Sequence, residues 1–459
     1  MSEDIKTMNP ANGESLETYT LMTDTEAADA VEACHAAFLD WRHESHDKRA
    51  AIIKAIGQHL RDNKDELAKL MTMEMGKLLS QSHQEIELCA AICDWTAEHG
   101  PDALASENRE LPDGGEGLIV YAPIGVIYGI QPWNFPAYQV IRYSIANLMA
   151  GNGVLLKHAS SVTGSGLMLQ KLYREAGLPE NLFKVLTISH DQSDVIIDND
   201  LVRGVTLTGS PDAGAIVAEK AGKALKKTVL ELGSNDAYIV LEDADLERAV
   251  KMCVQGRIYN NGETCIAAKR FIVVEEIYDA FSAAFVDAMG NIEHGDPMKD
   301  DVDMGPMARK DLRDDLHEQV QKSVDKGARI LCGGVMPEGE GFFYPASVLD
   351  EVAPGQPAYD DELFGPVAAL IRAKDADDAI RIANDSRFGL GGGIFSDDVD
   401  RATALAADHF DTGMVFINGF GLANPNMPFG GVKNSGYGRE HGGYGMKEFV
   451  NIKAVNVLG

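Results

Sequence analysis

Cys265 is the cysteine of this chain best placed to act as a nucleophile. It ends the segment 260–265 (NNGETC), in which a glycine-containing turn follows a predicted helix. A thiol exposed by such a turn can attack an electrophilic carbon once it is ionised. A lone cysteine is also a small hydrophobic residue that packs well in a core, so this segment alone leaves both interpretations open.

Glu231 and Asn134 offer a base and a hydrogen-bond donor, each just after a predicted strand. Glu231 follows the strand predicted at 228–230. Ligands of parallel sheets bind beyond such strand ends, where a carboxylate can act as a general base. Asn134 lies between the prolines of segment 131–136 (QPWNFP), where a rigidly held amide can donate to a developing oxyanion. Taken singly, Glu231 also suits a solvated loop and Asn134 a structural turn.

The segment 208–214 (TGSPDAG) can present backbone amides to a phosphate. Thr208, Gly209, Ser210 and Gly214 lie where a predicted strand passes into a predicted helix. The N-terminus of a helix attracts anions because its first N–H groups lack partners inside the helix. The segment lacks the three-glycine pattern of the standard dinucleotide fingerprint, and an ordinary strand-to-helix turn explains it equally well.

The composition is that of a large globular protein with an acidic surface. The 459 residues carry 71 acidic and 41 basic side chains, a formal net charge of −30. Nucleic acid and anionic membranes are therefore poor partners on electrostatic grounds, and an anionic substrate needs a local basic pocket. The sequence contains no run of about 18 apolar residues that would span a membrane.

The six cysteines indicate a reducing compartment and no metal. They stand at 34, 89, 93, 253, 265 and 332, without a Cys-x-x-Cys pair or the Cys and His spacing of a zinc site. Free thiols at this density are typical of the cytoplasm. The first residues have neither the basic nor the apolar region of a signal peptide. We therefore expect a cytoplasmic protein without a metal ion.

The order of the predicted elements favours an α/β protein with two sheets. Helices are predicted within 24–100, with Asp24 and Asn63 as caps and Gly100-Pro101 as the break that ends them. Turn residues within 106–121 predict a β-hairpin. Beyond it, apolar strands alternate with helices, as in parallel sheets covered on both faces. The predicted strands are 124–130, 153–157, 182–186, 202–207, 228–230, 238–241, 270–274, 367–371 and 449–457.

Six segments, in this order, resemble signatures of the aldehyde dehydrogenase superfamily. They are 132–136 (PWNFP), 208–210 (TGS), 231–233 (ELG), 262–265 (GETC), 362–366 (ELFGP) and 428–436 (PFGGVKNSG). The resemblance covers about residues 5–457, and the spacing of Glu231 and Cys265 also matches. At finer grain, 156–159 (LKHA) and 267–271 (AAKRF) are similar to segments of the short bacterial succinate-semialdehyde dehydrogenases.

The resemblance implies oxidation of an aldehyde to a carboxylic acid with NAD or NADP, through a cysteine thiohemiacetal and a thioester. Cys265 would attack the aldehyde, and the Asn134 amide with the Cys265 backbone N–H would hold the oxyanion. Glu231 would activate the water that hydrolyses the thioester. Glu440 matches a family residue proposed to relay protons. The implied cofactor-binding residues are Trp133, Lys157, Ser160, Thr208, Gly209, Ser210, Gly214, Leu232, Gly233, Glu362 and Phe364.

Two departures from the family pattern concern the cofactor. Ser234 replaces the last glycine of the usual Glu-Leu-Gly-Gly, which adds a side chain near the expected cofactor. Ser160 stands where NAD-preferring members often carry a glutamate. A charge that would repel the 2′-phosphate of NADP is therefore absent, and we expect NADP to be accepted.

Arg142 is the predicted binding residue for a substrate carboxylate. It lies on the predicted helix 138–150, about two helical turns after Asn134. A guanidinium matches a carboxylate in a two-pronged ion pair, and succinate-semialdehyde dehydrogenases carry an arginine at the matching position. A structural arginine paired with a nearby acid is the alternative. A second family arginine is absent because Tyr259 stands in its place, and whether Arg257 replaces it stays open.

The resemblance also implies a Rossmann-like cofactor domain, an α/β catalytic domain and a small β element for oligomerisation. The expected boundaries are 1–104 with 123–232 for the cofactor domain, 233–446 for the catalytic domain, and 105–122 with 447–459 for the oligomerisation element. Family members assemble as dimers or tetramers, so we expect a homodimer or a homotetramer.

Three other functions are compatible with parts of the pattern. The first is an aldehyde dehydrogenase for another aliphatic or aromatic aldehyde. The second is a non-enzymatic structural or binding member of the family, although a scaffold needs none of Cys265, Glu231 and Asn134. The third is a thiol hydrolase, which requires a histidine beside the cysteine, and the motif loops offer none.

Overall fold

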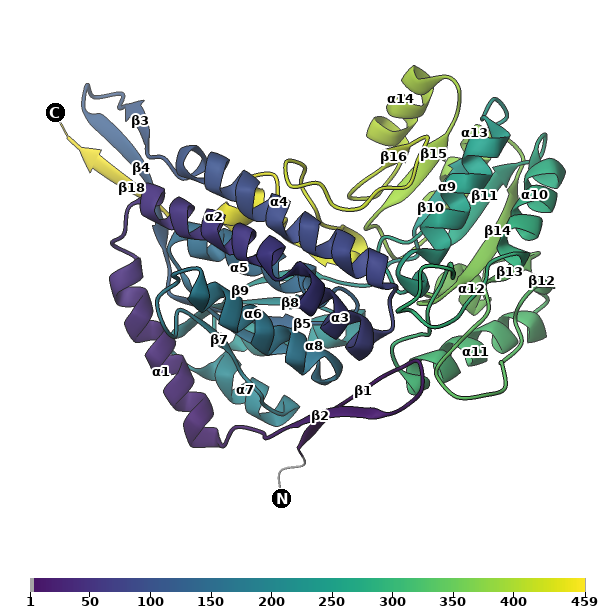
Figure 1. Cartoon of the computed structure of the whole chain (residues 1–459). Helices are drawn as coiled ribbons and strands as arrows, with labels where there is room; N and C mark the ends of the chain where they lie inside the picture. The colour runs from purple at the N-terminus through teal and green to yellow at the C-terminus, as the bar shows by residue number, and fades with distance from the viewer. Residues whose placement is uncertain (1–3, 459) are drawn as a thin grey trace.

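The computed structural model describes residues 4–458, which form an α/β protein built around two large sheets. The first sheet and its helices come mostly from the first half of the chain, and the second sheet from the second half (Figure 1). A separate three-stranded sheet extends from the first body and carries the C-terminal strand (Figure 1). The predicted fold class is confirmed.

The first sheet has the order β17-β9-β8-β5-β6-β7. All its pairings are parallel except that of β17, which runs antiparallel to β9. Helices connect the parallel strands, as the alternating pattern predicts. Its elements are β5 (Val126–Gln131), α5 (Tyr138–Ala150), β6 (Gly153–His158), η1 (Ser160–Val162), α6 (Thr163–Glu175), β7 (Phe183–Val185), α7 (His190–Asp198), β8 (Val202–Thr208), α8 (Pro211–Lys223), β9 (Lys227–Glu231), η3 (Lys433–Ser435) and β17 (Gly436–Tyr437).

The second sheet has the order β12-β13-β14-β11-β10-β15-β16 and is parallel except at β12. Its strands are β10 (Ala237–Val240), β11 (Arg270–Val274), β12 (Arg329–Cys332), β13 (Ser347–Asp350), β14 (Val367–Ala373), β15 (Gly392–Phe395) and β16 (Phe416–Ile417). Its helices are α9 (Leu246–Ile258), η2 (Tyr259–Gly262), α10 (Tyr278–Gly290), α11 (Lys310–Asp325), α12 (Pro357–Asp360), α13 (Ala376–Asn384) and α14 (Val399–His409).

Two smaller sheets complete the described chain. The predicted hairpin forms from β3 (Glu107–Glu110) and β4 (Glu116–Pro123), and the predicted final strand, β18 (Val450–Val457), pairs antiparallel with β4. The short helix α15 (Tyr444–Glu448) precedes β18. Near the N-terminus, β1 (Ile5–Met8) pairs with β2 (Ser15–Tyr19).

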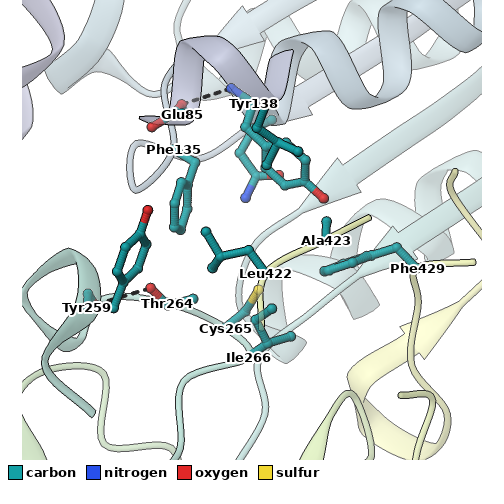
Figure 2. Close-up of a pocket in the computed structure, with 12 residues that line it drawn as sticks. Glu85, Phe135, Tyr138, Tyr259, Thr264, Cys265, Ile266, Leu422, Ala423 and Phe429 are labelled. Atoms are coloured by element: carbon teal, nitrogen blue, oxygen red, sulfur yellow. Dashed lines mark hydrogen bonds between the residues drawn. The ribbon is translucent and has the colours of Figure 1, made fainter. Parts of the chain in front are cut away.

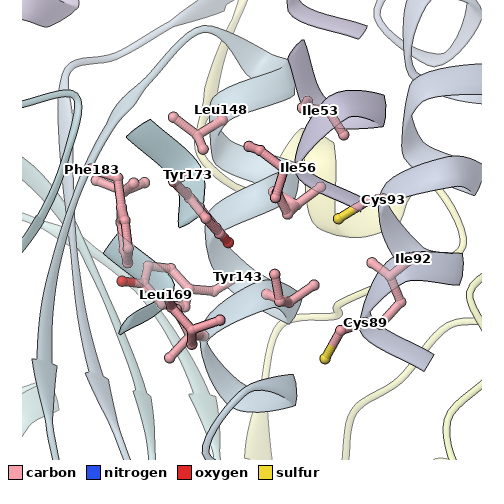
Figure 3. Close-up of a cluster of buried hydrophobic side chains, with 14 of the residues drawn as sticks. Ile53, Ile56, Cys89, Ile92, Cys93, Tyr143, Leu148, Leu169, Tyr173 and Phe183 are labelled. Atoms are coloured by element: carbon pink, nitrogen blue, oxygen red, sulfur yellow. The ribbon is translucent and has the colours of Figure 1, made fainter. Parts of the chain in front are cut away.

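Four helices precede the hairpin and cover the first sheet: α1 (Asp24–Trp41), α2 (His46–Asp62), α3 (Lys64–Met75) and α4 (Leu79–Ala103). Isoleucines of α2 and cysteines of α4 pack against aromatic residues of α5, α6 and β7 (Figure 3). This core fixes the position of α5, whose N-terminus follows the Asn134 corner.

The ends of these helices differ from the sequence prediction in three details. Thr23 rather than Asp24 caps α1, through a capping box with Glu26. The Asn63 side chain donates to the His59 carbonyl and so does not cap α3. Gly100-Pro101 does not break the helical region, because α4 continues through Pro101 to Ala103. Packing of α4 against α2 and α5 outweighs the local cost of the proline.

The described chain has neither a membrane-spanning helix nor a cluster of metal-binding side chains. Within residues 4–458, no helix is both long and apolar enough to cross a membrane. In the same residues, no group of three or more His, Cys, Asp or Glu side chains is placed to hold a metal ion.

Candidate functional site

The loop that carries Cys265 is held in a strained and closely packed turn. Asn260 and Asn261 have left-handed backbone angles, with φ of 56° and 58°, and Gly262 follows with φ of 76°. A side chain at Gly262 would collide with the backbone of Gly365. The turn after α9 was predicted from its glycine, and the structure adds the reason why only glycine fits there.

Cys265 opens into a pocket walled by aromatic and aliphatic side chains. Phe135, Tyr138, Tyr259 and Phe429 line it together with Leu422 (Figure 2). The sulfur of Cys265 faces Leu422 in the middle of this pocket (Figure 2). Such apolar walls suit a small, largely apolar ligand.

Asn134 is fixed against the cysteine loop. It is 4% exposed, and its amide nitrogen donates to the Glu263 carbonyl over 3.0 Å. Asn260 holds the same two segments together, because its amide donates to the Asn134 carbonyl at 2.9 Å and to the Glu263 carbonyl at 3.1 Å. The sequence indicated the rigid corner at Asn134. It did not indicate that Asn260 links this corner to the cysteine loop, because the left-handed conformation of Asn260 is visible only in the structure.

Glu231 ends β9 inside the protein rather than in a solvated loop. Its main chain pairs with Gly436 of β17, and neither carboxylate oxygen has a hydrogen-bond partner within the described chain. A side chain at Gly430 would press on one of these oxygens. Burial raises the pKa of Glu231 well above its usual value, and nearby Glu440 raises it further while Arg142 opposes both. A buried carboxyl beside an apolar pocket suits a general base whose proton affinity is increased.

Arg142, predicted to bind a substrate carboxylate, does not line the pocket of Cys265. Its side chain is 1% exposed and forms an ion pair with Glu440, and it donates to the Thr208 hydroxyl at 2.8 Å. The guanidinium stacks on the rings of Tyr138 and Phe429, which themselves line the pocket. Arg142 is thus paired with an acid, as in the alternative of a structural arginine, and its binding of a substrate carboxylate stays a prediction.

Glu440 lies in the same buried group. Burial raises its pKa, and the charge of Arg142 opposes that rise. The neighbouring His441 accepts or donates a 3.0 Å hydrogen bond with the Tyr138 hydroxyl, and burial lowers the pKa of His441 to about 3. His441 is therefore neutral near neutral pH and leaves Arg142 as the cation of this group.

Burial strongly disfavours the thiolate of Cys265. It raises the pKa of this thiol to about 12, while the charges of Arg142 and Lys269 act in the opposite direction. Lys269 had no assigned role in the sequence analysis, although it stands four residues after the cysteine. Its ammonium donates to the Cys265 carbonyl at 2.6 Å.

Lys157 and Ser160 lie together at a hollow of about 490 Å³ beside the first sheet. Thr163, His190 and Arg309 contribute to its lining. Burial lowers the pKa of Lys157, yet a lysine still offers a point charge to a phosphate. The hollow thus combines cations with a serine that adds no negative charge.

Glu362 lies against the end of the Glu-Leu-Gly segment. The backbone N–H of Ser234 donates to its carboxylate at 3.1 Å, and Gly233 leaves the space that this carboxylate fills. Trp133 and Phe364 meet edge to face, with ring centroids 5.8 Å apart. The side chain of Leu232 packs where a Cβ at Gly214 would be.

The side chain of Ser234 is buried and turns toward Asp236. Its hydroxyl donates to the Asp236 carboxylate, which also accepts the Gly391 N–H at 3.0 Å. Ser234 is 1% exposed. The serine is therefore an internal brace between β9 and the second sheet.

The segment 208–214 leads from β8 into α8, as predicted. Ser210 caps α8, with its hydroxyl accepting the Ala213 N–H at 3.2 Å. Gly209 leaves an open surface at the turn, since a Cβ there would meet nothing closer than 3.8 Å. Thr208 turns inward, and its hydroxyl accepts a hydrogen bond from Arg142 rather than bonding within the turn.

The order and geometry of these groups match a known family. Residues 1–455 match the aldehyde dehydrogenase family model. The chain belongs to this family. The family predicted from the six segments is therefore confirmed, and with it the interpretation of the chain as an enzyme of that family.

Similar proteins extend over nearly the whole aldehyde dehydrogenase chain. A succinate semialdehyde dehydrogenase [NAD(P)+] of Escherichia coli is 45% identical over 98% of this chain and 96% of its own. A succinate-semialdehyde dehydrogenase [NADP(+)] of Deinococcus radiodurans is 42% identical over 98% and 94%. The crystal structure of succinic semialdehyde dehydrogenase from Streptococcus pyogenes, in complex with NADP+, has a TM-score of 0.97, 38% identity, and covers 99% and 100%.

Proposed function

We propose that this enzyme oxidises succinate semialdehyde to succinate with NADP or NAD. The observation that carries the proposal is that Cys265 lines an apolar pocket, that the Asn134 amide is bonded to the loop carrying Cys265, and that Glu231 is buried without a hydrogen-bond partner within the described chain. Relatives with 42–45% identity over 98% of the chain are named for this substrate and these cofactors, which supports the choice of aldehyde. When bound, the nicotinamide cofactor supplies the acceptor for a hydride.

The protein's own groups divide the reaction into two halves. Cys265 attacks the aldehyde carbon, and the Asn134 amide with the Cys265 backbone N–H stabilises the negative oxygen of the thiohemiacetal. After hydride loss, Glu231 takes a proton from a water molecule that attacks the thioester and releases the carboxylic acid. We assign Glu440 to passing that proton onward, since it shares the buried group with Glu231 and Arg142.

For the cofactor we propose two contact regions. The hollow beside Lys157 and Ser160 takes the adenosine ribose, and its cations suit a 2′-phosphate. Glu362, with Trp133 and Phe364 nearby, takes the nicotinamide end. The open turn at Gly209 and Ser210, at the start of α8, faces the pyrophosphate.

Ser160→Glu should lower kcat/KM with NADP at least about tenfold and leave NAD nearly unchanged, because a carboxylate would repel the 2′-phosphate. Ser160→Ala is the matched control, since it alters the side chain without adding charge. Steady-state rates with both cofactors measure the ratio. An unchanged NADP to NAD ratio in Ser160→Glu would remove this residue from cofactor selection.

The substrate is tested with a panel of aldehydes on the wild-type enzyme. Succinate semialdehyde and butyraldehyde have the same chain length, but only the former carries a carboxylate. Formation of reduced cofactor, followed at 340 nm, should give a much higher kcat/KM for succinate semialdehyde. A preference for butyraldehyde or an aromatic aldehyde would favour the alternative of another aldehyde substrate, and no turnover at all would favour a non-enzymatic member.

We also propose the domain boundaries, the oligomeric state and the cellular location that were predicted from the sequence. The two large sheets and the three-stranded sheet support a cofactor domain at 1–104 and 123–232, a catalytic domain at 233–446 and an oligomerisation element at 105–122 and 447–459, with β17 of the catalytic domain reaching back to pair with β9 of the first sheet. The element supports a homodimer or homotetramer because β18 has exposed apolar side chains. The six cysteines are all free thiols, which supports a cytoplasmic location.

A further inference from the structure

Lys269 has a buried side chain that joins two parts of the site. Its side chain is 1% exposed, and its ammonium donates to the carbonyls of Cys265 at 2.6 Å and Thr264 at 3.2 Å. The same ammonium lies 3.2 Å from a carboxylate oxygen of Glu362. One side chain thus contacts both the nucleophile loop and the residue proposed for the nicotinamide end.

The backbone of Lys269 is held rigidly, which fixes where this charge lies. Its N–H donates to the Asp236 carbonyl at 3.1 Å, and its carbonyl accepts the Ala369 N–H at 3.0 Å. Lys269 directly precedes β11 in the middle of the second sheet. The ammonium therefore extends from the edge of a fixed strand to the carbonyls of the loop and can anchor the loop to the second sheet.

We propose that Lys269 is a positioning residue that fixes the Cys265 loop and places a positive charge beside the thiolate, with Glu362 setting how much of that charge remains unopposed. The inference rests on the proposed nucleophilic role of Cys265. A purely mechanical anchor would need hydrogen bonds only. Because Lys269 also pairs with Glu362, the residue proposed for the nicotinamide end, the Glu362 carboxylate partly offsets the positive charge that Lys269 places near the thiol.

Several other charged groups act on the Cys265 thiol besides Lys269. Arg142 and Lys269 favour the Cys265 thiolate, whereas Glu362 and Asp236 oppose it, and the Tyr138 hydroxyl lies within the same group. The variants therefore change one member of the Lys269–Glu362 pair at a time. Removing the lysine should lower the fraction of thiolate, and removing the glutamate charge should raise it. Arg142 stays paired with Glu440 in every variant below.

The test measures how fast iodoacetamide alkylates Cys265 in the cofactor-free enzyme between pH 7 and pH 9, with mass spectrometry of the peptide containing Cys265. Only the thiolate reacts, so the rate reports its fraction. Lys269→Met should displace the rate profile by about one pH unit to higher pH, which is about tenfold slower alkylation at a given pH. Lys269→Arg should stay close to wild type, and Glu362→Gln should alkylate faster.

Lys226→Met is the matched control, because Lys226 also donates to backbone carbonyls, including Asn199 at 2.6 Å, but lies outside the pocket. It should leave the rate unchanged. Equal rates in wild type and Lys269→Met would overturn the inference, as would slower alkylation in Glu362→Gln. If Lys269→Met does not fold, Lys269→Arg and Glu362→Gln decide it by the same criteria. Turnover of succinate semialdehyde that survived complete alkylation of Cys265 would overturn the proposed function itself, and this inference with it.

Discussion

At the scale of single residues, burial opposes the ionisation of both the nucleophile and the general base. Burial raises the pKa values of both Cys265 and Glu231, because an apolar environment disfavours charge. A protonated carboxyl cannot accept a proton, and a thiol is a poor nucleophile. The buried cations Arg142 and Lys269 favour the thiolate, so we expect turnover to depend on them.

Cys265→Ala should lower kcat by several orders of magnitude while leaving cofactor binding intact, because the covalent route is lost. Cys332→Ala is the matched control, since Cys332 is the other cysteine that is not fully buried among the described residues and lies in β12, outside the pocket. Rates at 340 nm and cofactor titration by fluorescence measure the two effects. Retention of more than a few per cent of kcat would contradict the assignment of the nucleophile.

Glu231→Gln should stop the reaction after hydride transfer, because acylation needs the thiolate whereas deacylation needs an activated water. Rapid mixing should show a burst of reduced cofactor followed by little turnover. In the wild type, deacylation should slow as the pH falls through the raised pKa of Glu231, since only the carboxylate accepts the proton. Loss of the burst itself would indicate that Glu231 acts earlier, in deprotonating Cys265.

At the scale of elements, helix α5 connects the apolar pocket of Cys265 to the buried Arg142–Glu440 pair. Its first turn contributes Tyr138 to the pocket, and its next turn carries Arg142 back to Glu440. The Glu85 carboxylate accepts the N–H groups of Ala137 and Tyr138 at 2.8 Å each. An anion at this position stabilises the start of the helix and so fixes both of its functional residues.

Arg142→Met should lower the free energy of unfolding by about 3–5 kcal/mol, because Glu440 would stay buried without its counter-charge. Urea unfolding should show a smaller loss in Arg142→Met/Glu440→Gln, where both charges are removed together. Turnover of succinate semialdehyde and butyraldehyde should fall to a similar extent. A loss confined to succinate semialdehyde would instead show that Arg142 leaves Glu440 to bind the substrate.

At the scale of the whole molecule, the three-stranded sheet offers an edge that the described chain leaves open. β18 pairs with β4 on one side and has no neighbour within residues 4–458 on the other. Ile452, Val455 and Val457 are 62%, 42% and 61% exposed. An open strand edge with apolar side chains is a common site of chain association.

Val455→Asp/Val457→Asp should shift the protein from an oligomer to a monomer, because two charges would be buried in the contact. Light scattering after size-exclusion chromatography measures the mass. Leu225→Asp is the matched control, since Leu225 is apolar and 94% exposed but lies after α8, away from this sheet. An unchanged oligomer in the double variant would place the interface elsewhere.

The sequence by itself determined the order of the elements and the positions of the reactive groups along them. Strands and helices alternate with periods that local composition encodes. Glu231 was placed correctly at a strand end and Asn134 at a rigid corner, because both positions follow from short segments. The glycine at position 262 also indicated the turn that leads to Cys265.

The tertiary structure alone decided which side chains face one another. Arg142 pairs with Glu440, which stands far away in the chain, and the sequence offered no signal for that contact. Ser234 turns toward Asp236, and Lys269 joins Cys265 to Glu362, for the same reason. A buried charge is costly unless an opposite charge lies beside it in space. Which residues become neighbours across two sheets is decided by packing, and the local sequence pattern does not encode it.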